Sequence, residues 1–131
     1  MSTFLVTGAG GFIGSSLSKK LLENPLNKVI TIDNFKTGFK RNIPKGVVLI
    51  EGDCSSEEII LKLNKYRFDC IFHIAGQSSG EISFDDPVYD LNTNTKSTLL
   101  LLQFAKKNNC KKFIFASTMS VYGNNKKECV R

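Results

Sequence analysis

The sequence predicts an α/β fold built on one parallel sheet, and three observations support this class. Strand-like and helix-like segments alternate along the 131 residues, which is the order that produces parallel strands joined by right-handed crossovers. The strand-like segments are continuous apolar runs, as expected for a sheet that is covered on both faces. A glycine-rich turn directly follows the first of them. We therefore expect one domain with three layers: helix, sheet and helix.

The stretch 4–14 (FLVTGAGGFIG) contains this turn, with glycines at positions 8, 11 and 14. Gly8 lets the chain turn sharply away from the strand, and Gly11 lets the backbone approach a pyrophosphate without an intervening side chain. Gly14 lets the first helix pack close to the sheet. Because the free N–H groups at the start of that helix attract an anion, the turn predicts a phosphate-binding site.

A second predicted strand, 28–32, ends in Asp33, nineteen residues after Gly14. An acidic residue at this place can accept hydrogen bonds from a ribose diol and would repel a 2′-phosphate, which favours NAD over NADP. The alternative is a glycine-rich loop without a ligand, followed by an aspartate that only caps a turn. The dinucleotide site is favoured because strand, turn, helix, strand and acid occur in the expected order.

The remaining elements continue the alternation. We predict strands over 4–6, 28–32, 47–51, 70–74 and 113–116, helices over 12–23, 55–64 and 88–108, and loops over 34–46 and 75–87. Pro25 ends the first helix, and Ser55 or Ser56 caps the second. Together these elements predict a Rossmann-type doubly wound parallel sheet of five strands in the order 3-2-1-4-5.

The polar segments of the chain fall where the predicted strands end. They are 7–14, Asp33, Asp53, 75–78 and 117–122. In sheets of this kind, ligands bind beyond the carboxyl ends of the strands, near the point where the strand order reverses. We therefore expect the binding site at this one edge, between the first and fourth strands.

Composition excludes several other classes of protein. An apolar content of 41% is too high for a disordered chain, and no apolar run is long enough to cross a bilayer. The start of the chain resembles no secretion signal, so a cytoplasmic location is expected. The net charge of +6 comes from lysines dispersed over the sequence without a recognition motif, and we expect no nucleic-acid partner.

The cysteines predict neither a metal site nor a disulfide framework. Cys54, Cys70, Cys110 and Cys129 are widely spaced, and the chain has a single histidine. We interpret the cysteines as reduced thiols. His73 stands at the end of a predicted buried strand, where a packed and hydrogen-bonded side chain is a more ordinary interpretation than a catalytic one.

Six segments of the chain carry a resemblance to a known family. They are Thr7-Gly8-x-x-Gly11-x-x-Gly14, Asp33-Asn34, Gly52-Asp53, His73-x-Ala75-Gly76, Asn94-x-x-Ser97-Thr98 and Ser117-Thr118-x-x-Val121-Tyr122-Gly123. These segments resemble the extended short-chain dehydrogenases/reductases, in particular the NAD-dependent nucleotide-sugar epimerases and dehydratases, and most of all the UDP-glucose 4-epimerase-like members. Ser97 is a departure, because the family usually has glycine there.

The resemblance implies NAD as the cofactor and a nucleotide sugar as the partner. The cofactor-binding residues that it implies are Gly8, Gly11, Phe12, Ile13, Gly14, Asp33, Asn34, Asp53, Cys54, Ala75, Gly76, Asn94 and Ser117. Among them, Asp53 and the backbone of Cys54 would meet the adenine. Thr118 is the implied catalytic residue, as the counterpart of the hydroxyl group that hydrogen-bonds the reacting sugar.

In this family a tyrosine, followed four residues later by a lysine, takes the proton of a sugar hydroxyl while hydride passes to the cofactor. Tyr122 and Lys126 have this spacing, but Gly123 and the asparagines after it favour a turn over a helix. Tyr122 also already matches the tyrosine of the family's Y-G turn. We therefore interpret the pair as a coincidence, and expect the true pair, the last strands and the substrate lobe beyond Arg131.

The sequence thus predicts the NAD-binding part of such an enzyme, truncated before the last strands and inactive alone. The alternatives are a stand-alone NAD-binding module and an interaction domain that no longer binds; the intact glycines and aspartates disfavour the second of these. The fifth strand would be left as an apolar edge with unpaired backbone groups. We accordingly expect a homo-oligomer that forms through this edge or through the 88–108 helix, which contributes to a dimer interface in the family.

Overall fold

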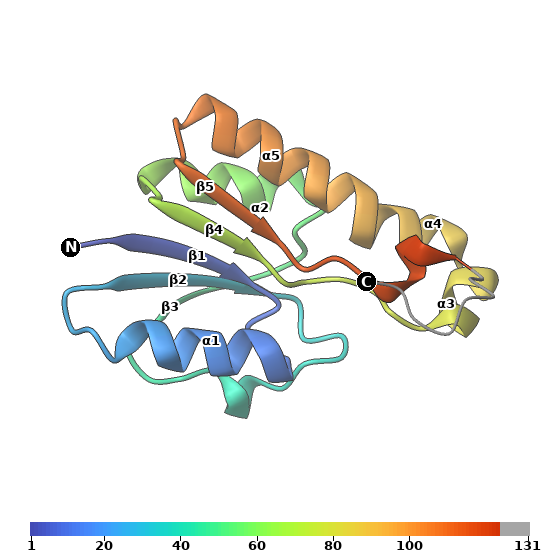
Figure 1. Ribbon diagram of the computed structural model, residues 1–131, viewed down its shortest axis with the longest axis horizontal. Helices are drawn as coiled ribbons and strands as arrows, with labels where there is room; N and C mark the ends of the chain where they lie inside the picture. Colours follow the sequence, from blue (N-terminus) through green and yellow to red (C-terminus); the bar gives the residue numbers. More distant parts are fainter. Residues whose placement is uncertain (124–131) are drawn as a thin grey trace.

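Five parallel strands form the centre of the structure, a computed structural model that describes residues 1–123 (Figure 1). Their order is β3-β2-β1-β4-β5, which confirms the predicted order 3-2-1-4-5. The strands are β1 (Thr3–Thr7), β2 (Lys28–Asp33), β3 (Val48–Glu51), β4 (Cys70–His73) and β5 (Lys112–Phe115). In the middle of the sheet, Leu5 pairs with Ile30 on one side and with Ile71 on the other.

Helices lie on both faces of this sheet. Helix α1 (Phe12–Leu22) covers one face, while α2 (Glu57–Leu61) and α5 (Ser97–Lys107) cover the opposite face (Figure 1). Two short helices, α3 (Gly80–Asp85) and α4 (Pro87–Asp90), lie beyond the carboxyl ends of the strands. The three-layer arrangement follows from strands that are apolar on both faces, since each face must be buried against a helix.

Each face of the sheet has its own apolar core. The larger core lies beneath α2 and α5; among its residues, Leu5, Ile30, Leu63, Ile71 and Leu101 are all fully buried. The smaller core lies beneath α1, where Val6 and Val29 of the sheet meet Leu17 and Leu21 of the helix. Successive residues of a strand point to opposite faces, so Leu5 and Val6 serve different cores.

The structure corrects four details of the predicted elements. The predicted loop 75–87 contains helix α3, and the loop 34–46 contains a short 3₁₀ helix, Lys40–Asn42. The predicted helix 88–108 begins at Pro87 and is interrupted by a π-helix, Leu91–Lys96, between α4 and α5. Ser56 occupies the N-cap position of α2, but its side chain makes no capping hydrogen bond.

Candidate functional site

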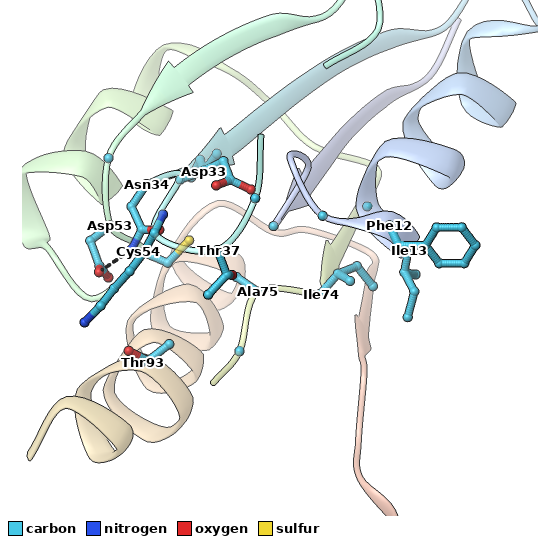
Figure 2. Close-up of a pocket in the computed structure, with 18 of the residues that line it drawn as sticks. Phe12, Ile13, Asp33, Asn34, Thr37, Asp53, Cys54, Ile74, Ala75 and Thr93 are labelled. Carbon is cyan, nitrogen blue, oxygen red and sulfur yellow. Dashed lines mark hydrogen bonds between the residues drawn. The ribbon is translucent and has the colours of Figure 1, made fainter. Parts of the chain in front are cut away.

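A pocket of about 340 Å³ opens at the carboxyl ends of β1, β2 and β4. Its lining includes eleven predicted residues: Gly8, Gly11, Phe12, Ile13, Gly14, Asp33, Asn34, Asp53, Cys54, Ala75 and Gly76. Figure 2 shows Asp33, Asn34 and Asp53 on one side of it, with Phe12 and Ile13 on the other. The structure thus brings four separate segments of the chain to the edge of the sheet where the sequence predicted a site.

The glycine turn between β1 and α1 is held by close backbone packing. Gly8 has a φ of +70°, which favours glycine, and its amide donates to the carbonyl of Ile32 at 2.9 Å. A Cβ atom on Gly8 would lie 2.8 Å from the backbone nitrogen of Ala75, and one on Gly14 would lie 2.1 Å from the carbonyl oxygen of Gly8. Side chains are therefore excluded at both positions, and α1 begins directly at the pocket.

Asp33 is fixed against this turn by both of its carboxylate oxygens. Oδ2 accepts a hydrogen bond from the amide of Gly10 at 2.7 Å, and Oδ1 accepts one from the amide of Phe35 at 2.7 Å. The residue is buried at the end of β2 and lines the pocket. Because each carboxylate oxygen can accept a further hydrogen bond, the group can still receive hydroxyl donors from a ligand.

Asp53 forms the next part of the same wall. Its Oδ2 accepts from the side-chain amide of Asn34 at 2.9 Å, and its Oδ1 accepts from the backbone amide of Ser55 at 2.8 Å. Burial raises the pKa of the Asp53 carboxyl group, but the hydrogen bonds from Ser55 and Asn34, together with the charge of Lys36, outweigh this and leave the pKa below its usual value. Asp53 is therefore an ionised acceptor at neutral pH.

The neighbouring thiol of Cys54 is not a reactive group. Burial raises its pKa to about 12, and the negative charges of Asp53 and Asp33 act in the same direction. Only a thiolate is a good nucleophile, so this side chain can contribute surface to the pocket but no covalent chemistry.

Six side chains of the pocket lining were not predicted: the apolar Ile32 and Ile74, and four that carry polar groups. Lys36 and Thr37 follow Asn34 in the loop after β2, whereas Tyr89 belongs to α4 and Thr93 to the π-helix. The ammonium group of Lys36 lies 3.2 Å from the centroid of the Tyr89 ring, which joins the loop to the helix across the pocket. Proximity to Asp33 and Asn34 in sequence could have identified Lys36 and Thr37.

Thr93 is unusual among the lining residues because its hydroxyl oxygen is buried without a hydrogen-bond partner in the described part of the chain. Figure 2 shows it near Asp53 and Cys54, on the helix side of the pocket. No sequence signal marked this residue, since a threonine inside a predicted helix has no specific meaning. Its place in the pocket lining is evident only in the folded chain.

Three predicted residues do not line the pocket. Asn94 instead holds the segment after β4: its Oδ1 accepts from the amide of Gln77 at 2.8 Å, and its Nδ2 donates to the carbonyl of Gln77 at 2.9 Å. Ser117 and Thr118 follow β5 and are exposed. The hydroxyl oxygen of Thr118 accepts from the amide of Ser120 at 3.2 Å and caps the 3₁₀ helix Met119–Tyr122.

His73 is buried behind the pocket at the end of β4, as a packed and hydrogen-bonded side chain. Its Nδ1 lies 2.8 Å from the hydroxyl oxygen of Thr7, and its Nε2 lies 3.2 Å from that of Ser97 and 3.1 Å from that of Thr98. Burial lowers its pKa to about 4, so the imidazole is neutral at physiological pH.

Residues 1–123 lack two kinds of feature. These residues contain no cluster of histidine, cysteine, aspartate or glutamate side chains that could hold a metal ion. They also form no helix with the length and apolar character that crossing a membrane requires.

Comparison with known proteins identifies relatives over nearly the whole chain. The sequence profile of the NAD-dependent epimerase/dehydratase family matches residues 4–130. A UDP-glucose 4-epimerase of Azospirillum brasilense is 34% identical over 120 residues, which are 91% of this chain and 34% of that protein.

Solved structures give the same result. The UDP-glucose 4-epimerase of Thermotoga maritima, solved with UDP-glucose, superposes with a TM-score of 0.90 at 38% identity over 95% of this chain and 41% of that one. The Thermus thermophilus enzyme, solved with NAD, has a TM-score of 0.82 at 37% identity, over 88% of this chain and 37% of that one. The chain thus spans between a third and about two fifths of the length of these relatives.

Proposed function

The chain belongs to the NAD-dependent epimerase/dehydratase family, and we propose that its 131 residues form the NAD-binding part of an enzyme that moves a hydride to and from a nucleotide sugar. The observation that carries this proposal is the pocket, in which a glycine turn, a helix start and a buried aspartate meet. Relatives of known structure hold NAD or UDP-glucose, which supports the same assignment.

The residues present fit a dinucleotide. The amides at the start of α1 can receive the diphosphate, because the lining at Gly11 has no side chain in the way. The carboxylate of Asp33 is positioned to accept the hydroxyl groups of a ribose, while Asn34 and Asp53 offer polar groups to the adenine end. NAD would supply a hydride acceptor and donor, and these residues would bind and orient it.

Asp33 supports a preference for NAD over NADP, because its carboxylate would repel a 2′-phosphate. We expect isothermal titration calorimetry of the purified chain to detect NAD binding, with at least about tenfold weaker binding of NADP. Replacement Asp33→Asn should weaken NAD binding and reduce this difference. Asp85→Asn removes the same charge from an exposed position on α3 and is the matched control. Failure to bind NAD, or equal binding of both dinucleotides, would contradict the proposal.

We also propose that these 131 residues bind the cofactor but do not turn over substrate. Tyr122 is 51% exposed at the end of a 3₁₀ helix, and Gly123 after it has φ +62° and ψ −157°. The backbone thus leaves helical geometry at this point, which disfavours a shared helix face for Tyr122 and Lys126; Lys126 itself lies outside the described residues. The test is to incubate the 131-residue chain with NAD and UDP-glucose, the nucleotide sugar with which a relative was solved. Epimerisation or oxidation of UDP-glucose would overturn the proposal that the chain has no turnover.

Self-association through β5 and α5 is the last part of the proposal. Ile114 and Phe115 of β5 and Leu99 and Leu102 of α5 are each between 45% and 53% exposed, and we call these four residues the β5–α5 surface. Among the described residues, β5 pairs only with β4, so its other edge offers free backbone groups to a second copy.

Light scattering over a range of concentrations tests this part. We expect a dimer or larger species that Ile114→Lys disrupts, because lysine on an edge strand opposes pairing. Leu26→Lys is the control, since Leu26 is also exposed but lies in the turn before β2. A monomer at every concentration would refute self-association without affecting the proposal on NAD.

A further inference from the structure

The hydrogen bonds around His73 determine which of its two ring nitrogens carries the proton. The side chain is 1% exposed, and its ring lies between Thr7 of β1 and the first residues of α5. The rings of Phe113 and Phe115 lie beside it, with centroids at 6.1 Å and 5.8 Å. The ring is thus enclosed by protein, and every polar contact that it makes can be assigned.

The contact with Thr7 assigns the first nitrogen. The hydroxyl oxygen of Thr7 accepts hydrogen bonds from the backbone amides of Ile74 at 3.1 Å and Ala75 at 3.0 Å. A hydroxyl group has two acceptor positions and one proton, so both acceptor positions are used. Its 2.8 Å contact with Nδ1 of His73 must therefore be a donation, which requires Nδ1 to be unprotonated.

The contacts with α5 assign the second nitrogen. The hydroxyl of Ser97 donates to the carbonyl of Thr93, and that of Thr98 donates to the carbonyl of Asn94 at 2.6 Å. Each of these hydroxyl groups has then used its single proton, so it can only accept from Nε2 of His73. The imidazole is therefore the neutral Nε2–H tautomer, shared between two acceptors at 3.2 Å and 3.1 Å.

These bonds form one directed chain between two walls of the pocket. It begins at the amides of Ile74 and Ala75, both of which line the pocket, and passes through Thr7 and His73 to the hydroxyls at the start of α5. It ends on the carbonyls of the π-helix, the element that places Thr93 in the opposite wall. A change in the direction of any one bond would leave a buried donor or acceptor unpaired.

We propose that His73, as a neutral Nε2–H imidazole, is a positioning residue that sets the spacing between the β4 end and the π-helix wall of the pocket, with Ser97 and Thr98 as interchangeable acceptors. The assignment of the tautomer stands on geometry alone. The positioning role of His73 rests on the proposed function, because a change in the spacing of the two walls would be detected as a change in the affinity for NAD. Ser97 matters here because its hydroxyl supplies an acceptor that a glycine at this position would lack.

Long-range ¹H–¹⁵N NMR of the wild-type chain tests the tautomer directly. We expect a proton on Nε2, an unprotonated Nδ1, and no titration of the ring between about pH 8 and about pH 5.5. A proton on Nδ1, or a ring that titrates near its ordinary value of 6.5, would overturn the proposal. This measurement needs no ligand, so it is decided even if the chain does not bind NAD.

Calorimetry with NAD tests the positioning role. Either Ser97→Ala or Thr98→Val leaves one acceptor and should change the affinity less than about threefold, whereas the double variant leaves Nε2–H unpaired and should weaken binding about tenfold. The double variant should also move the His73 ring resonances. Additive single effects, or wild-type affinity in the double variant, would contradict the role; a wild-type chain that binds no NAD would remove it together with the proposed function.

A matched control is present on α1. Ser18 is fully buried, and its hydroxyl donates to the carbonyl of Gly14 at 2.8 Å, the same bond to the residue four before it that Ser97 makes. Ser18 makes no hydrogen bond to the imidazole in the described part of the chain. Ser18→Ala should therefore leave both the His73 resonances and the affinity for NAD unchanged, which separates loss of the acceptors from the general loss of a buried serine hydroxyl.

Discussion

A methyl group at Gly14 would collide with the backbone of the glycine turn. A Cβ atom there would lie 2.1 Å from the carbonyl oxygen of Gly8 and 2.7 Å from its carbonyl carbon, distances that real Cβ atoms essentially never show. The obstructing atoms are backbone, so they cannot rotate aside as a side chain can, and α1 must shift from β1 or the turn must open. We expect Gly14→Ala to lower the free energy of unfolding by about 3 kcal/mol or more, the upper part of the range for overpacking.

Urea unfolding followed by far-UV circular dichroism measures this loss. Gly80→Ala is the matched control, because an added Cβ at Gly80 has no atom within 4 Å and the residue begins α3. It should change the free energy of unfolding by less than about 1 kcal/mol. Equal unfolding midpoints for Gly14→Ala and the wild type would refute the reasoning from backbone contact.

Gly11→Ala separates packing from binding. Its added Cβ would lie 3.3 Å from the carbonyl oxygen of Gly8, and the backbone at Gly11 is extended, with φ −81° and ψ 175°. Alanine tolerates this conformation, so we expect a loss of stability below about 1 kcal/mol. The methyl group would nevertheless enter the pocket lining, and NAD should bind at least about tenfold more weakly. Unchanged affinity would show that no diphosphate approaches Gly11.

Three further outcomes are expected. Burial lowers the pKa of His73 to about 4 from an ordinary 6.5, so between these pH values the folded chain binds fewer protons than the unfolded chain; the stability from this group is fully present above about pH 6.5 and is lost as pH falls through about 4. In urea unfolding, the difference in unfolding free energy between wild type and His73→Gln should change by about 3 kcal/mol over this range. A difference that does not depend on pH would contradict this. In native alkylation mapped by mass spectrometry, Cys54 should resist labelling while the partly exposed Cys110 reacts, and early labelling of Cys54 would mean that its wall of the pocket opens. Leu101→Ala should cost about 2–5 kcal/mol in the same urea assay and Leu102→Ala less than about 1, because Leu101 is fully buried and Leu102 is 45% exposed; similar losses would refute this assignment of the faces of α5.

The order of the strands was predictable because it follows from local pattern and general rules of connection. Each strand is a short apolar run, and right-handed crossovers leave few arrangements for five of them. Helix α3 was missed for the opposite reason. Its six residues have little helical preference of their own, and the segment is held by Gln77, whose side chain donates to Ser83 at 3.0 Å and to Asp90 at 2.9 Å. Such support from side-chain hydrogen bonds leaves no periodic signal in the sequence.

The site was predictable to the extent that its parts are backbone features. Glycines and strand-terminal aspartates have fixed meanings at a carboxyl edge, so Gly8, Gly14 and Asp33 could be assigned before the chain was folded. Side chains that reach the pocket from helices could not. Tyr89 of α4 and Thr93 of the π-helix line it, and nothing in the residue types between Pro87 and Lys107 predicts either the π-helical stretch or the face that meets the pocket.

The glycine turn and the loop after β2 are in direct backbone contact at Gly10. The carbonyl of Gly10 accepts from the amide of Phe39 at 3.0 Å and from the side chain of Asn42 at 2.8 Å, while a Cβ atom on Gly38 would lie 2.8 Å from the carbonyl carbon of Gly10. During evolution, neither segment can vary freely without the other. A loop exchange intended to alter cofactor preference must therefore include Gly38 and Asn42. A graft that ends at Asn34 would leave the glycine turn packed against a loop from a different protein, without matched contacts.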